Sequence, residues 1–405
     1  MGELVKEGIL EAPLDGNHGE KHPTSDEYVD SGIPFLMASD IHNGEVNIYS
    51  CKYITKERAE RLDKGFARNG DVLLTHKATI GETAILSNLM TEYAMLTPQV
   101  TYYRIKNEER LNREYLYSFF NSLDFQTELK TKAAQSTRPY IGITAQQNLK
   151  IILPAEIDEQ IRIGLYFRNL DHLITLHQRK CDQTKNLKKY MLQKMFPQNG
   201  AKVPEIRFDG YTYDWEQRKL GEVLISLQNN TLSRADLSNE TGIAKNVHYG
   251  DVLIKFGDVL DVSREQLPMI KDEKILDKYK ASFLQNGDVI IADTAEDTTV
   301  GKCSEIAGLR DEVVLSGLHT IPYRPVEKFA TGYLGYYLNA SAYHDQLIPL
   351  MQGIKVTSIS KYAMQDTDIV YPKSIEEQAM IGSYFQSLDH LITLHQRQHK
   401  LHLNM

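Results

Sequence analysis

The sequence contains an internal repeat, and this feature constrains the possible folds more than any other. Residues 157–180 and 375–398 are identical at 17 of 24 positions, ten of them consecutive, at an offset of 218 residues (375 minus 157). Chance does not produce such similarity, and fixed-offset self-similarity is the signature of a repeated structural unit. The chain is therefore predicted to be a tandem pair of related halves, roughly 2–187 and 221–405.

Similarity within the repeat is uneven. The segments that begin near residues 155 and 373 are nearly the same, whereas the stretch before each is strongly diverged. Copies that keep one part and vary another suggest a shared scaffold carrying two different recognition surfaces. The expected boundaries are a variable domain over 1–154, a conserved helix over 155–200, a linker or start of the second repeat over 201–220, a variable domain over 221–372 and a conserved helix over 373–405.

The two conserved segments have the apolar spacing of long helices. Alternating steps of four and three residues give a heptad-like seam in each copy. The first helix is predicted to run about 40 residues, or roughly 60 Å at 1.5 Å per residue, and to pack antiparallel to the second. The seam residues are Ile163, Phe167, Leu170, Ile174 and His177, and Ile381, Phe385, Leu388, Ile392 and His395. Four leucines widen this stripe and predict a surface for a further protein: Leu173, Leu176, Leu391 and Leu394.

His395, His399 and His402 have the i, i+4, i+7 spacing of one helix face, but no carboxylate partner follows them. The seam histidines are interpreted as hydrogen-bonded core residues, and no bound metal is expected. Cys51, Cys181 and Cys303 are few and far apart, which indicates neither a disulfide framework nor a zinc site and favours a reducing cytoplasm. The N-terminal residues lack the apolar core of a signal peptide, and no run approaches the ~18 apolar residues of a membrane span.

The main catalytic motifs are also absent from the sequence. We find no Gly-rich cofactor loop after a strand, no N/D-P-P-Y/F motif, no Walker A sequence, no GxSxG and no HExxH. A metal-dependent nuclease needs converging carboxylates and a lysine. Asp214, Glu216 and Lys219 suggest this only loosely, because they flank Trp215 in the expected linker. We assign no catalytic residue and interpret the chain as a binding protein.

The variable halves are predicted to be mixed domains of the α+β class, since short apolar strands are punctuated by Gly and Asn and accompanied by few helices. In the first half the expected elements are strands over 33–38, 46–50, 71–75, 83–86, 99–105 and 149–153, and one helix over 112–133. In the second half they are strands over 259–262, 288–292, 312–316 and 368–371, and one helix over 328–348.

Three blocks carry a family resemblance: residues 375–392 with Pro372 before them, 214–223, and 316–325. With the repeated layout, they make the chain similar to the specificity (S) subunit of type I restriction–modification systems. The resemblance implies two pseudo-symmetric α/β target-recognition domains, separated by long antiparallel coiled-coil-like helices. Each domain would read one half of an asymmetric, bipartite double-stranded DNA site.

The resemblance also implies partners. The helices would set the spacer and dock two methyltransferase (M) subunits, with restriction (R) subunits as an optional addition. S-adenosylmethionine, Mg and ATP would belong to those partners, so the chain itself would be non-catalytic and hold no cofactor. One departure is visible: the family's WEQRKLGE-like lead occurs only at 215–222, whereas residues 1–3 begin where a first copy of that lead would end.

Polar and basic loops supply the candidate DNA-reading residues, although surface loops without function are an equally good interpretation of each. In the first domain they are Lys77, Thr79, Arg138 and Tyr140. In the second they are Thr298, Thr299, Lys302, Lys355 and Ser358. The alternative function is a coiled-coil adaptor that joins proteins and does not read DNA.

The charge distribution bears on DNA affinity. The formal net charge is −8, and both variable domains are acidic, with 17 basic against 21 acidic residues in 1–150 and 14 against 21 in 221–372. Phosphate contacts supply most non-specific affinity for DNA. We therefore expect weak DNA binding by the isolated chain, with partners supplying much of the phosphate neutralisation.

Overall fold

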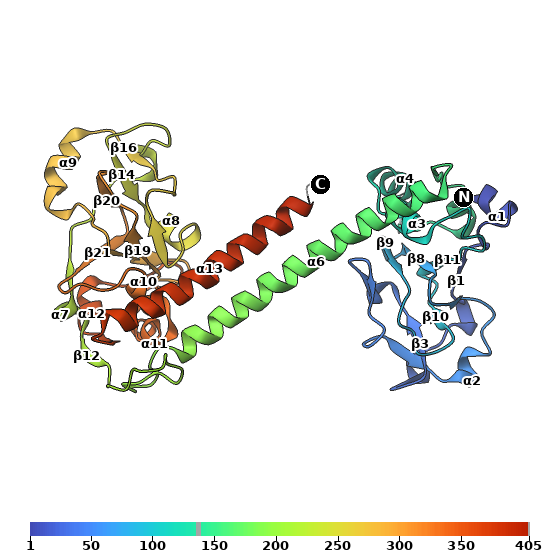
Figure 1. The fold of residues 1–405 in the computed structure, drawn as a ribbon, viewed down its shortest axis with the longest axis horizontal. Helices are drawn as coiled ribbons and strands as arrows, with labels where there is room; N and C mark the ends of the chain where they lie inside the picture. The colour runs from blue at the N-terminus through green and yellow to red at the C-terminus, as the bar shows by residue number, and fades with distance from the viewer. Residues whose placement is uncertain (135–138, 404–405) are drawn as a thin grey trace. The chain divides into compact units, whose positions relative to one another are not determined.

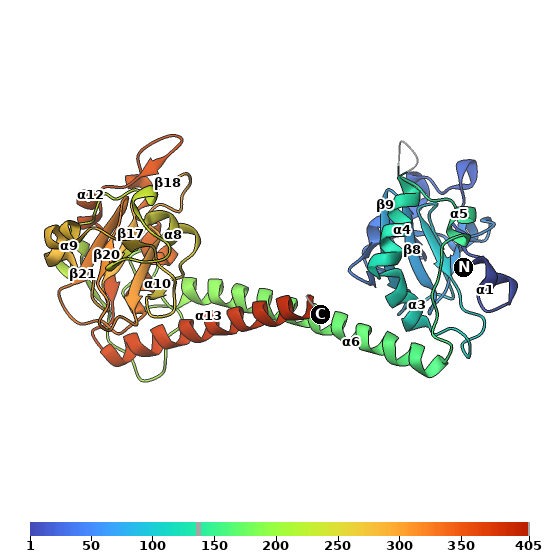
Figure 2. The ribbon, with the colours of Figure 1, turned by 90° about the horizontal axis from the view of Figure 1, so that it is seen from above.

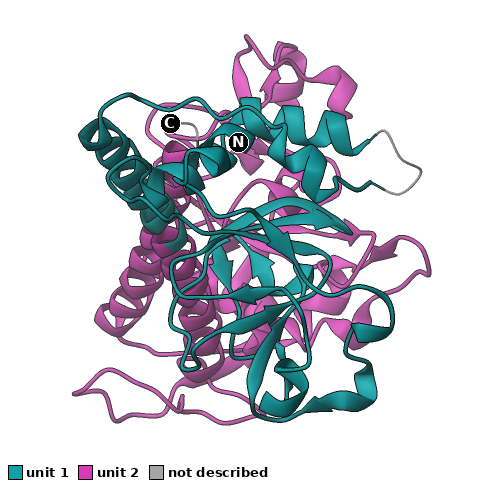
Figure 3. Cartoon of the chain, turned by 90° about the vertical axis from the view of Figure 1, so that its right-hand side faces the viewer, with its two compact units in different colours: residues 1–175 teal, residues 176–405 magenta. Residues whose placement is uncertain are grey.

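A computed structural model describes residues 1–134 and 139–403. The chain divides into two compact units, Met1–Thr175 and Leu176–Met405 (Figure 3). The division falls inside the long helix α6, Ile157–Lys194. Each unit thus combines a mixed α/β body with part of a long helix.

Unit 1 has two larger sheets and a two-stranded antiparallel pair, β4-β5. An antiparallel four-stranded sheet has the order β1-β11-β8-β9, and a five-stranded sheet has the order β2-β6-β3-β10-β7 with one parallel pair, β3 and β10. The strands are β1 Leu14–Asp15, β2 Tyr28–Val29, β3 Ile33–Leu36, β4 Ile41–His42, β5 Glu45–Val46, β6 Lys52–Ile54, β7 Phe66–Ala67, β8 Val72–Lys77, β9 Thr79–Ile85, β10 Ala94–Leu96 and β11 Val100–Tyr103. The helices before α6 are α1 Gly2–Lys6, α2 Lys56–Ala59, α3 Arg113–Phe120, α4 Leu123–Ala133 and α5 Ile143–Gln147.

Unit 2 has a five-stranded sheet of order β13-β21-β17-β19-β15, a three-stranded sheet of order β16-β14-β20, and two-stranded pairs β12-β23 and β18-β22. The strands are β12 Glu216–Lys219, β13 Leu224–Ser226, β14 Ala244–Val247, β15 Val259–Asp261, β16 Met269–Ile270, β17 Val289–Ala292, β18 Thr294–Ala295, β19 Cys303–Ala307, β20 Val314–Ser316, β21 Thr320–Pro325, β22 Thr357–Ser358 and β23 Asp368–Tyr371. The helices are α7 Leu220–Val223, α8 Tyr249–Ile254, α9 Glu273–Tyr279, α10 Tyr333–Asn339, α11 Ser341–His344, α12 Lys361–Gln365 and α13 Ile375–Leu403.

An arginine–aspartate pair marks the scaffold that the two units share. Arg104 in unit 1 donates to both carboxylate oxygens of Asp71, at 2.9 and 2.7 Å. Arg324 in unit 2 does the same to Asp288, also at 2.9 and 2.7 Å. Two-pronged pairs of this kind fix geometry as well as adding energy. The mixed α/β architecture expected for both halves is confirmed, including its duplication.

The helices predicted over 112–133 and 328–348 each form two shorter helices, α3 and α4 in unit 1 and α10 and α11 in unit 2. In unit 1, Asn121 ends α3 and the Ser122 hydroxyl accepts from Phe125 N–H, so α4 begins with its own N-cap. In unit 2, Ala340 has an extended backbone between α10 and α11. The prediction of one uninterrupted helix in each place was wrong, because apolar spacing does not reveal a local cap.

The predicted strand over 149–153 does not form, although its counterpart in unit 2 does. Strand β23 pairs antiparallel with β12, Glu216 opposite Tyr371. Residues 151–154 of unit 1 are irregular, and among the described residues no strand pairs with them. A strand needs a hydrogen-bonded neighbour, so the same sequence pattern gives different structure in the two units.

The segment over 201–220 contributes Trp215 and Leu220 to the core of unit 2. Trp215 is 2% exposed and packs against Phe196 and Tyr333, with ring centroids 6.3 Å apart in both cases. Because Trp215 is the single tryptophan of the chain, this aromatic group gives unit 2 its own spectroscopic marker.

Within unit 2, the C-terminal half of α6 and helix α13 lie side by side and antiparallel, as expected (Figure 2). The Nδ1 atoms of His177 and His395 are 3.3 Å apart. Further along, Lys188 Nζ is 2.6 Å from the Asp389 carboxylate. Rising numbers on α6 therefore meet falling numbers on α13 (Figure 1). No described helix is both long and apolar enough to cross a lipid bilayer.

Candidate nucleic-acid interface

In unit 1 the structure brings three of the candidate residues together at one hairpin. Lys77 ends β8 and lies opposite Thr79 at the start of β9, with Ala78 between them at a φ of 70°. Lys77 also forms an antiparallel bridge with Tyr140, whose side chain is 39% exposed. The fourth candidate, Arg138, lies outside the described residues.

A buried histidine supports this hairpin. His76 has no exposed surface, and its Nδ1 lies 3.0 Å from the carbonyl oxygen of Ile141. Its ring centroid is 5.6 Å from that of Tyr140. Burial lowers the pKa of His76 to about 4, so the imidazole is neutral at physiological pH and Nδ1 donates to the carbonyl. The histidine holds Tyr140 at the surface without contributing charge.

Unit 2 presents a different set of side chains at the equivalent place. Ser358 of β22 is opposite Thr294 of β18, and a bridge between Gln352 and Ser358 closes a short loop. Lys355 is exposed in this loop beside Ile354, whose side chain is fully exposed. At the repeat offset, Ser358 corresponds to Tyr140 (358 minus 218). The shared scaffold therefore displays Tyr140 in one unit and Ser358 in the other.

The remaining three candidates of unit 2 divide into exposed and structural residues. Thr298 is exposed, and the hydroxyl of its neighbour Thr299 donates to Asp297 at 2.5 Å. Lys302 instead turns inward: its ammonium donates to the carbonyl oxygens of Leu253 and Phe256, at 2.8 and 3.1 Å. Burial lowers the pKa of Lys302. Two of the three ammonium N–H groups of Lys302 are thus engaged within unit 2, and its role as a DNA contact stays a prediction.

Sequence reasoning missed two residues at this surface. His319 has a φ of 54°, and its Nδ1 lies 3.4 Å from both Asp293 and Thr294. Its ring packs edge-on against Tyr249, with centroids 5.3 Å apart. The signal was present in the 316–325 block, which carried the resemblance. Ile354 was also detectable, as a single large apolar residue in a short polar loop.

The leucines expected to contact a partner differ in exposure. Leu391 and Leu394 on α13 are 41% and 39% exposed, whereas Leu173 and Leu176 on α6 are partly buried. Exposed leucines on one helix face are typical of a protein-binding surface, so the α13 pair remains the better candidate.

The predicted seam residues also differ between the units. In unit 2, Ile381, Phe385 and Leu388 are buried, and His177, Ile392 and His395 are partly buried. In unit 1, Ile163, Leu170 and Ile174 are partly buried, and Phe167 is 45% exposed. Among the residues that the structure describes, no group of three or more His, Cys, Asp or Glu side chains could hold a metal ion.

The structure consists of two related α/β units with long helices. A model of the family described as type I restriction modification DNA specificity domain matches residues 8–186 and again 213–404. The chain therefore belongs to this family, as its resemblance suggested.

Relatives agree with this assignment. The chain is 23% identical over 385 residues to the type I restriction enzyme MjaVIII specificity subunit of Methanocaldococcus jannaschii, covering 92% of this chain and 83% of that protein. It is 25% identical over 210 residues to the MjaIX specificity subunit of the same organism, covering 49% and 46%. The crystal structure of a type I restriction–modification S subunit from M. genitalium has the same fold, with a TM-score of 0.54, 11% identity, and coverage of 96% and 90%.

Proposed function

We propose that each unit reads one half of an asymmetric, bipartite double-stranded DNA target for a type I restriction–modification complex. The observation that carries this proposal is that the two units present different side chains at equivalent surfaces. One scaffold presents Lys77, Thr79 and Tyr140 in unit 1, and Thr294, Lys355 and Ser358 in unit 2. Sequence is read by side chains at base edges, so different side chains on one scaffold predict two different half-sites.

Two methyltransferase subunits are the proposed protein partners, with restriction subunits as a further addition. Helix α13 supports this through the exposed pair Leu391 and Leu394. In this proposal the chain is non-catalytic and acts in the cytoplasm. S-adenosylmethionine, Mg and ATP are proposed to act on the partner subunits.

Electrostatics support a division of labour between the chain and its partners. Both variable domains carry net negative charge, while residues 151–200 have 8 basic against 5 acidic residues. Each phosphate that a protein neutralises steepens the salt dependence of binding, and few such contacts are available here. The chain supplies sequence information, and the partners supply much of the grip on the backbone.

The test is a gel-shift titration of the assembled complex on its own methylation target, at several salt concentrations. Lys77→Ala is expected to weaken binding several-fold and to lower the slope of log K against log salt by about one. The matched control is Lys106→Ala, an exposed lysine of unit 1 outside the hairpin. Equal effects of the two substitutions would remove the β8–β9 hairpin from the interface.

A further inference from the structure

One segment of the acidic second domain contains no carboxylate. Residues 221–372 hold 21 acidic residues, yet none lies between Asp345 and Asp366. This stretch of 20 residues (366 minus 345, minus 1) contains Lys355 and Lys361. The equivalent residues 129–147 of the first domain likewise include three basic residues and no acidic residue. In both acidic domains, the sequence therefore removes charge repulsion at one place where a phosphate backbone could approach.

In unit 2 the acid-free stretch is also rich in exposed apolar side chains. Four large hydrophobic residues in it are exposed, by 47%, 101%, 54% and 71% respectively: Ile348, Ile354, Val356 and Tyr362. The ammonium of Lys361 lies over the Tyr362 ring, 5.4 Å from its centroid. Apolar groups interleaved with cations complement a nucleic acid, which offers base faces and phosphates side by side.

Ile354 lies in a loop whose backbone shape is fixed. Gln352 and Ser358 exchange two backbone hydrogen bonds, at 2.9 and 2.8 Å, which close the loop between them. Gly353 has a φ of 116°, and a Cβ at this position would lie 2.0 Å from the carbonyl oxygen of Val356, so the turn requires glycine. The loop projects from the body of unit 2 beside β18 (Figure 2). The whole side chain of Ile354 is thereby held in solvent.

This loop adjoins the surface proposed to read DNA. Strand β22 ends the loop and pairs with β18, so that Ser358 lies opposite Thr294. Lys355 follows Ile354 directly, which places a cation next to the exposed apolar side chain. Apolar side chains, isoleucine among them, can enter between neighbouring base pairs, unstack that step and kink the duplex.

We propose that Ile354 is a wedge that enters the stack of base pairs at one step of the half-site read by unit 2, with Lys355 on an adjacent phosphate. The inference rests on the proposed function and adds a second way of reading sequence to it. Pyrimidine–purine steps deform most easily, so Ile354 selects such a step without a hydrogen bond to any base. At the repeat offset, residue 136 is a serine (354 minus 218), so the wedge acts in one half-site only.

The test uses the complex of the full chain with its methyltransferase partner, bound to its methylation target. The duplexes carry 2-aminopurine, a base analogue whose fluorescence rises when it is unstacked, at one position after another. A methyltransferase extrudes its own target base, so the informative signal is the part that depends on Ile354. We expect a rise at one step in the half-site of unit 2 that Ile354→Ala abolishes, and no such Ile354-dependent rise in the other half-site.

Salt dependence separates the wedge from the cation beside it. In gel-shift titrations, Ile354→Ala should weaken binding about tenfold and leave the slope of log K against log salt unchanged, because no charge is lost. Lys355→Ala should instead lower that slope by about one. Replacing the unstacked step by a stiff A-tract step should weaken binding by the unsubstituted chain but not by Ile354→Ala. Both residues are exposed, so the variants should fold normally.

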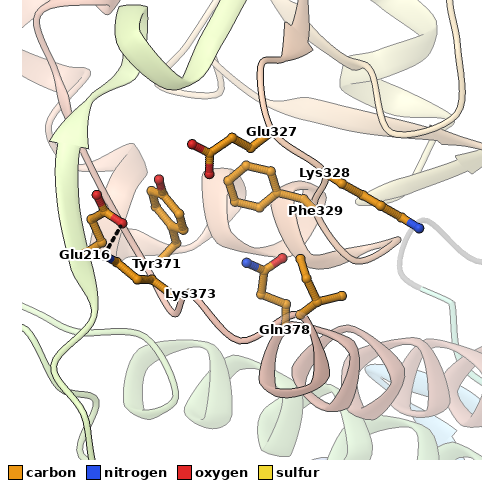
Figure 4. Close-up of a pocket in the computed structure, with 8 residues that line it drawn as sticks. Glu216, Glu327, Lys328, Phe329, Tyr371, Lys373 and Gln378 are labelled. Atoms are coloured by element: carbon orange, nitrogen blue, oxygen red, sulfur yellow. Dashed lines mark ion pairs between the residues drawn. The ribbon is translucent and has the colours of Figure 1, made fainter.

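Matched controls come from the opposite end of β21. Ile225 is 56% exposed and lies opposite Arg324 near the end of β21, whereas His319 directly precedes the start of that strand. Lys328 is exposed at the rim of a hollow beside Phe329 (Figure 4). Ile225→Ala and Lys328→Ala should leave the unstacking signal, the affinity and the salt slope unchanged.

Two results would overturn the wedge. One is unstacking that Ile354→Ala leaves unchanged in a complex that still methylates a bipartite target. The other is loss of methyltransferase-subunit binding in Ile354→Ala, measured by calorimetry, with unstacking retained, because Ile354 would then face a protein. A complex whose methylation is not bipartite would overturn the proposed function, and the wedge with it, so the two failures are distinguishable.

Discussion

The two repeat glutamates give the sharpest prediction about stability. Glu377 and Glu159 lie in the same sequence context, but Glu377 is buried against Arg207 and Trp215 while Glu159 is exposed. Breaking a buried ion pair costs about 3–5 kcal/mol, because it leaves an uncompensated buried charge. Glutamine preserves the shape and one acceptor oxygen, so we expect Glu377→Gln to lower the free energy of unfolding of unit 2 by about 3 kcal/mol.

The assay uses the intrinsic fluorescence of Trp215, which reports on unit 2 alone because the chain has no other tryptophan. At roughly 2–4 °C per kcal/mol for a unit of this size, the thermal midpoint should fall by about 6–12 °C. Glu159→Gln should leave that midpoint unchanged. Equal shifts in the two variants, or no shift in Glu377→Gln, would refute the assignment of Glu377 as a buried anchor.

Three further predictions follow from individual side chains. Because the pKa of His76 is depressed from 6.5 to about 4, the unfolded state binds more protons in that window. The free energy of unfolding of unit 1 should thus be highest above pH 6.5 and fall by about 3 kcal/mol as the pH drops to 4. Urea titrations followed by circular dichroism measure this change, and His76→Gln should abolish it. Lys302→Ala should destabilise unit 2 by about 2 kcal/mol in thermal melts and leave DNA affinity unchanged in gel shifts. Lys355→Ala should instead lower DNA affinity and leave the stability of unit 2 unchanged. Combined Leu391→Ser and Leu394→Ser should weaken methyltransferase-subunit binding about tenfold by calorimetry, without changing the melting temperature.

Features encoded locally were predictable from the sequence. The seam of α6 and α13 follows from apolar spacing alone, and the antiparallel packing of the two helices in unit 2 agrees with it. The repeat predicted two related units, and both contain the same arginine–aspartate pair. These successes rest on periodicity and internal similarity, which need no knowledge of distant contacts.

Features that depend on distant residues were not predictable in the same way. The strand expected at 149–153 fails because strand formation needs a partner, which β12 supplies only in unit 2. The inward hydrogen bond of Lys302 was not predictable, because nothing near Lys302 in the sequence reveals the carbonyl oxygen of Leu253. Ser122 could have been recognised as an N-cap, yet the apolar pattern on both sides favoured one continuous helix.

The central claim is that each unit reads its own half of one DNA target. The most direct measurement is methylome sequencing of DNA modified by this chain with its methyltransferase partner, before and after residues 221–372 are exchanged for another recognition domain. We predict that one half of the methylated sequence changes while the other half stays the same. Methylation that is indifferent to the exchange would contradict the account and favour a protein adaptor that does not read DNA.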